Sequence, residues 1–198
     1  MRGALEVASD KEIASLEKHV VYELVPITSV PAGQRVVGRR WVNKIKADGT
    51  YRGRLAERGQ SQVPGIDCNG TFSPVCRLQS IRMMLAIAAK DNEVFMLDFH
   101  TAFLNADVEE DIFVNMVPGD EIAAKPGVPL VMKLAKSLHG LRKSPKNCFG
   151  TMDHHLAEIG SRPLKSDPVF TYARMTPTLS FLRCTWTTFF YWEGTSSC

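Results

Sequence analysis

An apolar run that ends in a carboxylate places the strongest constraint on this chain. Val94–Leu97 has the composition of a buried strand, and Asp98 follows it directly. Removing a carboxylate from water is costly unless it is hydrogen-bonded, paired or bound to a cation. These residues alone leave two interpretations open. Asp98 is either the N-cap of a helix that begins within Thr101–Leu104, or a ligand for a hard cation such as Mg²⁺.

Composition indicates an ordinary globular protein. A chain of 198 residues with 44% apolar and 23% charged residues can bury the core of one substantial domain. No apolar run approaches the roughly 18 residues that cross a bilayer, and early acids such as Glu6 and Asp10 interrupt any signal-peptide core. We therefore expect an intracellular protein, cytoplasmic or nuclear. The five cysteines form no C-x-x-C pair, which favours reduced thiols over a zinc site.

A basic hairpin is the clearest local prediction. Two strand-like segments, at residues 39–46 and 50–59, flank Asp48-Gly49, a strong hairpin signal. The strand pleat sends Arg52, Arg54 and Arg58 to one face. Tyr51, Leu55 and Glu57 take the other face. The net charge of +3 is too small to prove a nucleic-acid partner. The cationic face is either a phosphate-binding surface or a solvated strand surface.

The remaining elements mix helices and strands without a repeated strand-helix-strand order, which predicts an α+β fold. We expect a loop from Gln60 to Pro74, strands at 20–25, 111–116 and 130–134, and a further strand from Asp167. A short helix capped by Ser9 and Glu12 and a second helix at Arg77–Lys90 are also expected. A third helix should begin at Ser144-Pro145 and end at Gly160, with an apolar face formed by Phe149, Met152, Leu156 and Ile159.

Three longer segments then resemble a known family. LDFHTAFLNADVEEDIFVNMVPG is similar to the copia-type reverse transcriptase signature LDVKTAFLNG with its acidic stretch, strand and PxG. RRWVNKIKADGTYRGRLAERG resembles the family's WVFKIK, DG and YKARLVAKG, and KLAKSLHGLRKSPKNCF resembles LxKSLYGLKQAPRxW. The resemblance extends from about Ala4 to Tyr172. It implies the fingers and palm, incomplete, of a right-hand reverse transcriptase fold over residues 1–172.

The resemblance also implies roles for individual residues. Asp98 matches the first aspartate of a two-metal Mg²⁺ site for nucleotidyl transfer. Arg52 and Arg54 match the Lys and Arg that reach the incoming deoxynucleotide triphosphate. Phe103 matches the aromatic residue under the sugar, and Gly140 a glycine near nucleotide and template. Without the family, Phe103 is a plain core residue and Gly140 an ordinary turn. The implied partners are an RNA or DNA template-primer and deoxynucleotide triphosphates.

The chain departs from the family at its end. A working palm needs a YVDD hairpin, and residues 173–198 contain none. A shifted reading frame combines the third base of each codon with the first two bases of the next codon. From Cys184 to Glu193, this frame is compatible with the sequence YVDD-ILLL-G. In that frame, the last base of the Trp186 codon and the first two bases of the Thr187 codon can encode only Asp. Single positions also drift, because the family has Ala, Gly, Tyr and Trp at Gly53, Ala106, His139 and Cys148.

These departures predict an inactive fragment of a retrotransposon RNA-directed DNA polymerase with a frameshifted tail. The alternative is a residual, non-catalytic nucleic-acid-binding module that uses the cationic fingers. A working polymerase would need metal ligands from another chain or a corrected frame. We also expect the loss of the catalytic hairpin to leave a sheet edge uncovered.

Overall fold

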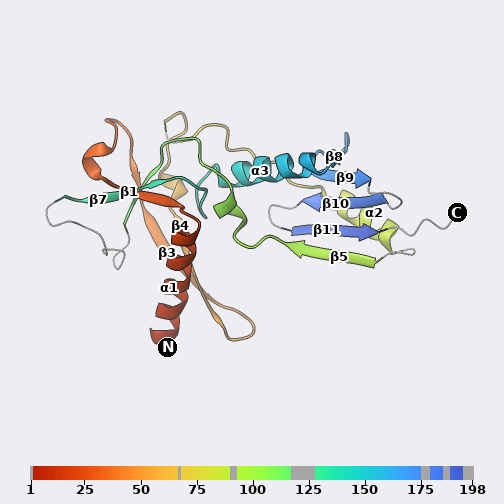
Figure 1. Ribbon diagram of the computed structural model, residues 1–198, viewed down its shortest axis with the longest axis horizontal. Coiled ribbons are helices and arrows are strands. Elements are labelled where there is room, and N and C mark those ends of the chain that lie inside the picture. Colours follow the sequence, from red (N-terminus) through yellow and green to blue (C-terminus); the bar gives the residue numbers. More distant parts are fainter. Residues whose placement is uncertain are drawn as a thin grey trace. The chain divides into compact units, whose positions relative to one another are not determined.

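The protein contains two compact units. The computed structural model in Figure 1 describes residues 2–66, 68–89, 93–116, 128–174, 179–184 and 188–193. Unit 1 comprises residues 1–71 and 103–147, and unit 2 comprises residues 72–102 and 148–198. Within the described residues, no helix is both long and apolar enough to cross a membrane.

A four-stranded sheet forms the centre of unit 1. Its order is β1 (Tyr22–Pro26), β7 (Leu130–Leu134), β6 (Phe113–Asn115) and β2 (Val36–Val37), with only the β2–β6 pair parallel. The strands expected at 20–25, 111–116 and 130–134 are thus confirmed, with β6 shorter than predicted. Apolar side chains from the sheet and from neighbouring segments form one core: Leu16, Val21, Val37, Leu55, Leu104, Ile112, Val114, Met132, Leu134, Leu138 and Leu141.

The basic hairpin is also in unit 1 and matches its prediction. Strands β3 (Arg39–Ile45) and β4 (Tyr51–Glu57) pair antiparallel. In the turn, the Asp48 carboxylate accepts the Thr50 backbone N–H at 2.9 Å, and Gly49 has φ +78°. The pleat acts as expected. Along β4, Leu55 and Glu57 are buried, whereas Arg52 is exposed and Arg54 half-buried.

The first helix is longer than predicted. Helix α1 (Arg2–Lys18) begins seven residues before Ser9 and packs against β4, as Figure 1 shows. The capping-box prediction is therefore wrong. The Ser9 hydroxyl donates to the Leu5 carbonyl oxygen at 3.0 Å, an interaction of a serine inside a helix. The apolar spacing beyond Ser9 was right, since Leu16 lies in the core.

Unit 2 is built on a five-stranded sheet. Its order is β5 (Glu93–Asp98), β11 (Thr188–Glu193), β10 (Leu179–Cys184), β9 (Phe170–Arg174) and β8 (Arg162–Pro163), with all neighbours antiparallel. Strands β10 and β11 come from the tail that has no family counterpart. The expected uncovered edge is therefore wrong on this side of β5, because β11 pairs along the whole strand.

Two helices complete unit 2. Helix α2 (Leu78–Ala88) falls within the predicted range, and its expected last residue, Lys90, lies outside the described residues. Helix α3 (Ser144–Glu158) extends from unit 1 into unit 2. A second core joins it to the sheet: Cys76, Met152, Leu156, Val169 and Phe170, with Ile81, Phe149 and Leu164 against them.

The predicted ends of α3 are right in part. Ser144 is already helical, and its hydroxyl donates to the Leu138 carbonyl oxygen at 2.7 Å, so its predicted place before the helix is wrong by one residue. Gly160, with φ +80°, donates its N–H to the Ala157 carbonyl oxygen, which confirms the predicted termination. Ile159 is 58% exposed and does not join the apolar face.

Short 3₁₀ turns link the larger elements. They are η1 (Ile27–Ser29), η2 (Gly59–Ser61) and η3 (Ala102–Asn105). The segment expected as a loop at 60–74 is irregular apart from η2 and an isolated bridge between Pro64 and Cys68. The described residues thus form a mixed α and β structure with sheets in both units.

Candidate functional site

The cationic face of the β3–β4 hairpin is wider than the sequence analysis predicted. Residues directly opposite each other in an antiparallel pair share a face, and the register places Lys44 opposite Arg52 and Arg40 opposite Ala56. Arg40 and Lys44 therefore join Arg52, Arg54 and Arg58. Of the five, four are exposed and Arg54 is half-buried. The hairpin presents an array of positive charges over two strands.

His139 links this face to Phe103. The rings of Phe103 and His139 meet edge to face, with centroids 4.9 Å apart. Burial, together with the positive charges of Arg54 and Arg52, lowers the pKa of His139 to about 4. The imidazole is thus neutral at physiological pH. The four residues predicted to contact the nucleotide, Arg52, Arg54, Phe103 and Gly140, all lie in unit 1, with His139 between them in this network.

The turn that carries His139 and Gly140 is docked on the end of β4. The Glu57 backbone N–H donates to the His139 carbonyl oxygen at 2.7 Å. From the same turn, Arg142 donates its backbone N–H to the Gln62 side-chain oxygen and its Nε–H to the Gly59 carbonyl oxygen, both at 2.9 Å. These contacts fix the turn against the end of β4 and the residues that follow it.

Gly140 has a clear packing requirement. Its φ is +95°, a conformation that favours glycine. A Cβ at Gly140 would lie 2.1 Å from the Glu57 carbonyl oxygen, and one at Gly59 would lie 2.1 Å from the Gly140 carbonyl oxygen. Two glycines therefore let two backbone segments touch. The structure gives Gly140 a reason in packing, and its role near a nucleotide stays a prediction.

Beneath this contact lies a buried ion pair that the sequence analysis missed. The Arg39 Nε and a Glu57 carboxylate oxygen are 3.0 Å apart, with side chains 1% and 0% exposed. Arg39 also donates from Nη1 to the Met132 sulfur at 2.6 Å. Burial raises the pKa of Glu57 to about 7, although Arg39 opposes the shift. The sequence did contain an indication of this buried carboxylate. The pleat placed Glu57 on the apolar face of its strand, at a position where the family form YKARLVAKG has alanine.

Asp98 is the last residue of β5, where it pairs with Thr188 of β11. It belongs to unit 2, whereas the four predicted nucleotide residues belong to unit 1. The N-cap interpretation fails, because the nearest following helix, η3, begins at Ala102 and Asp98 stands four residues before it. Thr101, between Asp98 and Phe103, has φ +53°, a strained conformation for a β-branched residue.

The described residues do not assemble a metal centre. None of their His, Cys, Asp and Glu side chains form a group of three or more that could hold a metal ion. A two-metal site needs several carboxylates, and the predicted ligand Asp98 would be only one of them. Residues 185–187, where the shifted frame has its aspartates, lie outside the described part of the chain.

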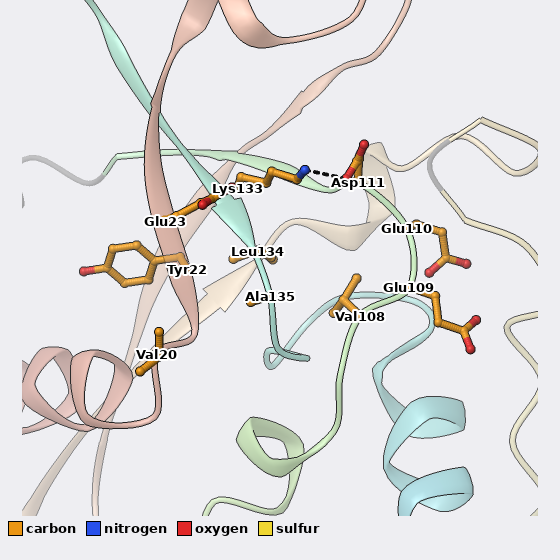
Figure 2. A pocket seen from close by; sticks show the side chains of 10 residues that line it. All are labelled: Val20, Tyr22, Glu23, Val108, Glu109, Glu110, Asp111, Lys133, Leu134 and Ala135. Atoms are coloured by element: carbon orange, nitrogen blue, oxygen red, sulfur yellow. Dashed lines mark ion pairs between the residues drawn. The ribbon is translucent and has the colours of Figure 1, made fainter.

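A hollow in unit 1 is lined by several acidic side chains, which are already neutralised in part. Figure 2 shows the residues that line it, among them Glu109, Glu110 and Asp111. The Lys133 ammonium lies 2.8 Å from Asp111, and Lys143 pairs with both glutamates. The three carboxylates thus form ion pairs with lysines, which is consistent with a structural role for this acidic segment.

In unit 2, Asp167 joins the strand region to α2. Its Oδ2 accepts the Ser80 hydroxyl at 2.6 Å and the Arg77 backbone N–H at 3.0 Å, and its Oδ1 accepts the Val169 N–H. Burial raises the pKa of Asp167, but these hydrogen bonds outweigh it and leave the pKa below its ordinary value. The sequence marked this residue only as the start of a strand. A carboxylate directly before Pro168 and an apolar run could have identified it, although at Asp98 the carboxylate follows the apolar run.

Comparison with known proteins identifies the class. The profile of the family described as Reverse transcriptase (RNA-dependent DNA polymerase) matches residues 20–175. The chain belongs to this family, which generally uses divalent metal ions and implies binding of a template-primer.

The relatives identify the branch of the family as copia-type. The chain is 37% identical over 179 residues to the retrovirus-related Pol polyprotein from transposon TNT 1-94 of Nicotiana tabacum, covering 87% of this chain and 13% of the relative. It is 33% identical to that of transposon RE1 of Arabidopsis thaliana, over 77% of this chain and 11% of the relative. The Ty1-NL2 Gag-Pol polyprotein of Saccharomyces cerevisiae is 29% identical over 63% of this chain and 7% of the relative. The chain thus corresponds to a small reverse transcriptase segment of these retrotransposon polyproteins.

Replacing Gly140 by alanine should destabilise unit 1. The new Cβ would clash with the Glu57 backbone and adopt an unfavourable φ, so we expect a loss of at least about 2 kcal/mol in the free energy of unfolding. Gly49→Ala is the matched control, since Gly49 also has positive φ but a Cβ there meets nothing within 4 Å. Urea denaturation measures both. Equal losses in the two variants would contradict the packing argument.

Glu57 should make stability fall as pH rises from about 4.5 to about 7. In this range the unfolded chain releases the Glu57 proton while the folded chain keeps it, so a higher pH favours unfolding, by up to about 3 kcal/mol. His139 acts in the opposite direction over an overlapping range, because its pKa is lowered on folding.

Comparison of Glu57→Gln with the unaltered protein isolates the Glu57 effect. In urea titrations, the free energy of unfolding of the unaltered protein should fall relative to that of Glu57→Gln as the pH is raised from about 4.5 to 7. A difference that stays constant across this range would show that Glu57 does not titrate between the two states.

Proposed function

We propose that residues 1–172 form part of the fingers and palm of a right-hand reverse transcriptase, followed by a frameshifted tail at 173–198, and that the chain is inactive as a polymerase. Arg52 and Arg54 would neutralise the triphosphate of a deoxynucleotide, and Phe103 would pack under its sugar. Gly140 would let the backbone approach the nucleotide and template. Asp98 would contribute one carboxylate to the catalytic Mg²⁺ site.

The observation that carries this proposal is the strand register beside Asp98. Thr188 of β11 pairs with Asp98, and β10 ends at Cys184. In the shifted frame, the codon that overlaps Trp186 and Thr187 must encode aspartate, and the codon that overlaps Thr187 and Thr188 can also encode aspartate. The tail thus supplies two antiparallel strands next to β5, and the shifted frame would place its YVDD box between the end of β10 at Cys184 and the start of β11 at Thr188. Residues 184–188 of this chain contain no carboxylate.

What the described side chains can do without this box is limited to binding. The arginines provide positive charge, neutral His139 holds Phe103, and the docked turn keeps Gly140 against β4. When bound, Mg²⁺ would supply activation of the primer hydroxyl and stabilisation of the transferred phosphoryl group. Asp98 alone does not fit such a metal pair, so no catalytic step is assigned to the present chain.

We expect no nucleotide incorporation in a primer-extension assay with Mg²⁺ on a primed RNA template. The missing carboxylates leave the metal site incomplete. Nucleotide incorporation by the unaltered protein that is lost in Asp98→Ala would contradict the proposal that the chain is inactive. The coding DNA tests the frameshift separately, because a shifted frame that does not spell YVDD at Cys184–Thr188 would refute it.

The second candidate function, a non-catalytic nucleic-acid-binding module, is favoured by the five cations on one face of the hairpin. Near Gly140, Arg40 and Arg58 border a hollow of about 430 Å³. Neither guanidinium has an ion-pair partner among the described residues, so both are available for backbone phosphates.

Binding of a primer-template should therefore weaken steeply with salt. Each phosphate contact contributes about 0.9 to the slope of log affinity against log salt concentration. We expect Arg40→Ala with Arg58→Ala to reduce that slope by about 1 to 2, whereas Arg162→Ala, an exposed arginine of β8 in unit 2, should leave it unchanged. Fluorescence anisotropy at several salt concentrations measures this. Equal reductions in both proteins would mean that the charges act without a defined surface.

A further inference from the structure

Helix α1 lies before the residues matched by the family profile, yet it contacts the strand that carries Arg52 and Arg54. The profile begins at residue 20, and α1 ends at Lys18. In the part of the chain that the structure describes, β3 is the only strand paired with β4, so the other edge of β4 is left for α1 and the turn at His139. The helix is drawn in dark red beside this hairpin in Figure 1.

The contact is made by a carboxylate on the free edge of β4. Alternate N–H groups of an edge strand point away from its partner. At Leu55 this N–H donates to Glu12 Oε1 at 3.4 Å, and at Glu57 it donates to the His139 carbonyl oxygen at 2.7 Å. Glu12 and His139 therefore take neighbouring outward donors on one edge.

Gly53 brings the helix close to β4, on the face opposite to the Arg52 and Arg54 side chains. It stands between Arg52 and Arg54, and a Cβ at this position would lie 3.3 Å from the Ala8 carbonyl oxygen. The family form has alanine here, so the substitution that the sequence analysis treated as drift gives α1 additional room to approach. The approach places Glu12, one helical turn beyond Ala8, near the strand.

Charge links Glu12 to the same arginines. Burial raises the pKa of Glu12, and the Leu55 N–H together with the positive charges of Arg54 and Arg52 opposes that rise. Burial also lowers the pKa of Arg54, Arg52 adds to this effect and Glu12 counteracts it. No ion pair within 4 Å joins Glu12 to either arginine among the described residues, so their guanidinium groups stay open to another anion.

We infer that Glu12 is a built-in anion that sets how tightly Arg52 and Arg54 hold a triphosphate. This inference rests on the proposed function of the two arginines. A bound triphosphate is attracted by the guanidinium groups and repelled by the Glu12 carboxylate, so the helix lowers the affinity of the site. Glu12 is a residue that tunes binding through charge, and it takes no part in the chemistry.

The test uses inorganic triphosphate as the probe and calorimetry of the full chain at pH 8. Glu12→Gln keeps an oxygen acceptor for the Leu55 N–H and removes only the charge. We expect it to bind triphosphate about two- to fivefold more tightly, the range of a partly exposed charge interaction. Glu17→Gln makes the same charge change at an exposed position of α1, and we expect it to match the unaltered protein. Arg54→Ala should lose most of the affinity.

The outcomes separate this inference from the proposed function. Tighter binding by Glu12→Gln alone, with unchanged thermal unfolding, supports the inference, since loss of a merely structural contact would not strengthen binding. Unchanged or weaker binding by Glu12→Gln, or an equal gain in Glu17→Gln, overturns it while Arg54→Ala still upholds the triphosphate site. An unaltered protein that does not bind triphosphate, or an Arg54→Ala variant with full affinity, overturns the proposed role of the arginines and the inference with it.

Discussion

The contact between Gly140 and the backbone of Glu57 organises unit 1. It requires a left-handed backbone at one residue and the absence of two side chains, at Gly140 and Gly59. Once it forms, the His139 carbonyl oxygen takes the Glu57 N–H, and the His139 ring reaches Phe103. The contact of His139 with Phe103 and the position of Gly140 thus depend on one close approach between a turn and the end of a strand, far apart in sequence.

Local patterns predicted most of the elements, because their physical causes are local. The Asp48-Gly49 turn and the alternation of Leu55 and Glu57 with the arginines needed no tertiary information. The extent of α1 and the position of Glu12 on β4 depend on packing between distant segments, which no single window of sequence contains. Of the candidate site, the sequence could assign the arginines to one face. It could not show that His139, noted only as drift, stands beside Phe103.

The tail shows why family likeness and strand formation are separate properties. Residues after Ala173 follow no family block, yet Thr188–Glu193 pairs with every residue of β5. Backbone hydrogen bonds do not depend on side-chain identity, and aromatic and β-branched residues suit a pleated surface. A strand can therefore persist where the chemistry carried by the original residues is absent. Asp98 keeps its place at a strand end beside a neighbour that offers no carboxylate at Thr188.

The buried pair of Arg39 and Glu57 has a consequence for how this sequence can change over generations. Each charge is tolerated because the other is present, and loss of either alone would strand an ion in the protein interior. The family form has alanine at the position of Glu57 and therefore lacks this carboxylate. A single substitution at either position therefore leaves the other charge buried without its partner. The pair thus couples two positions on neighbouring strands, so that a tolerated change at one requires a matching change at the other.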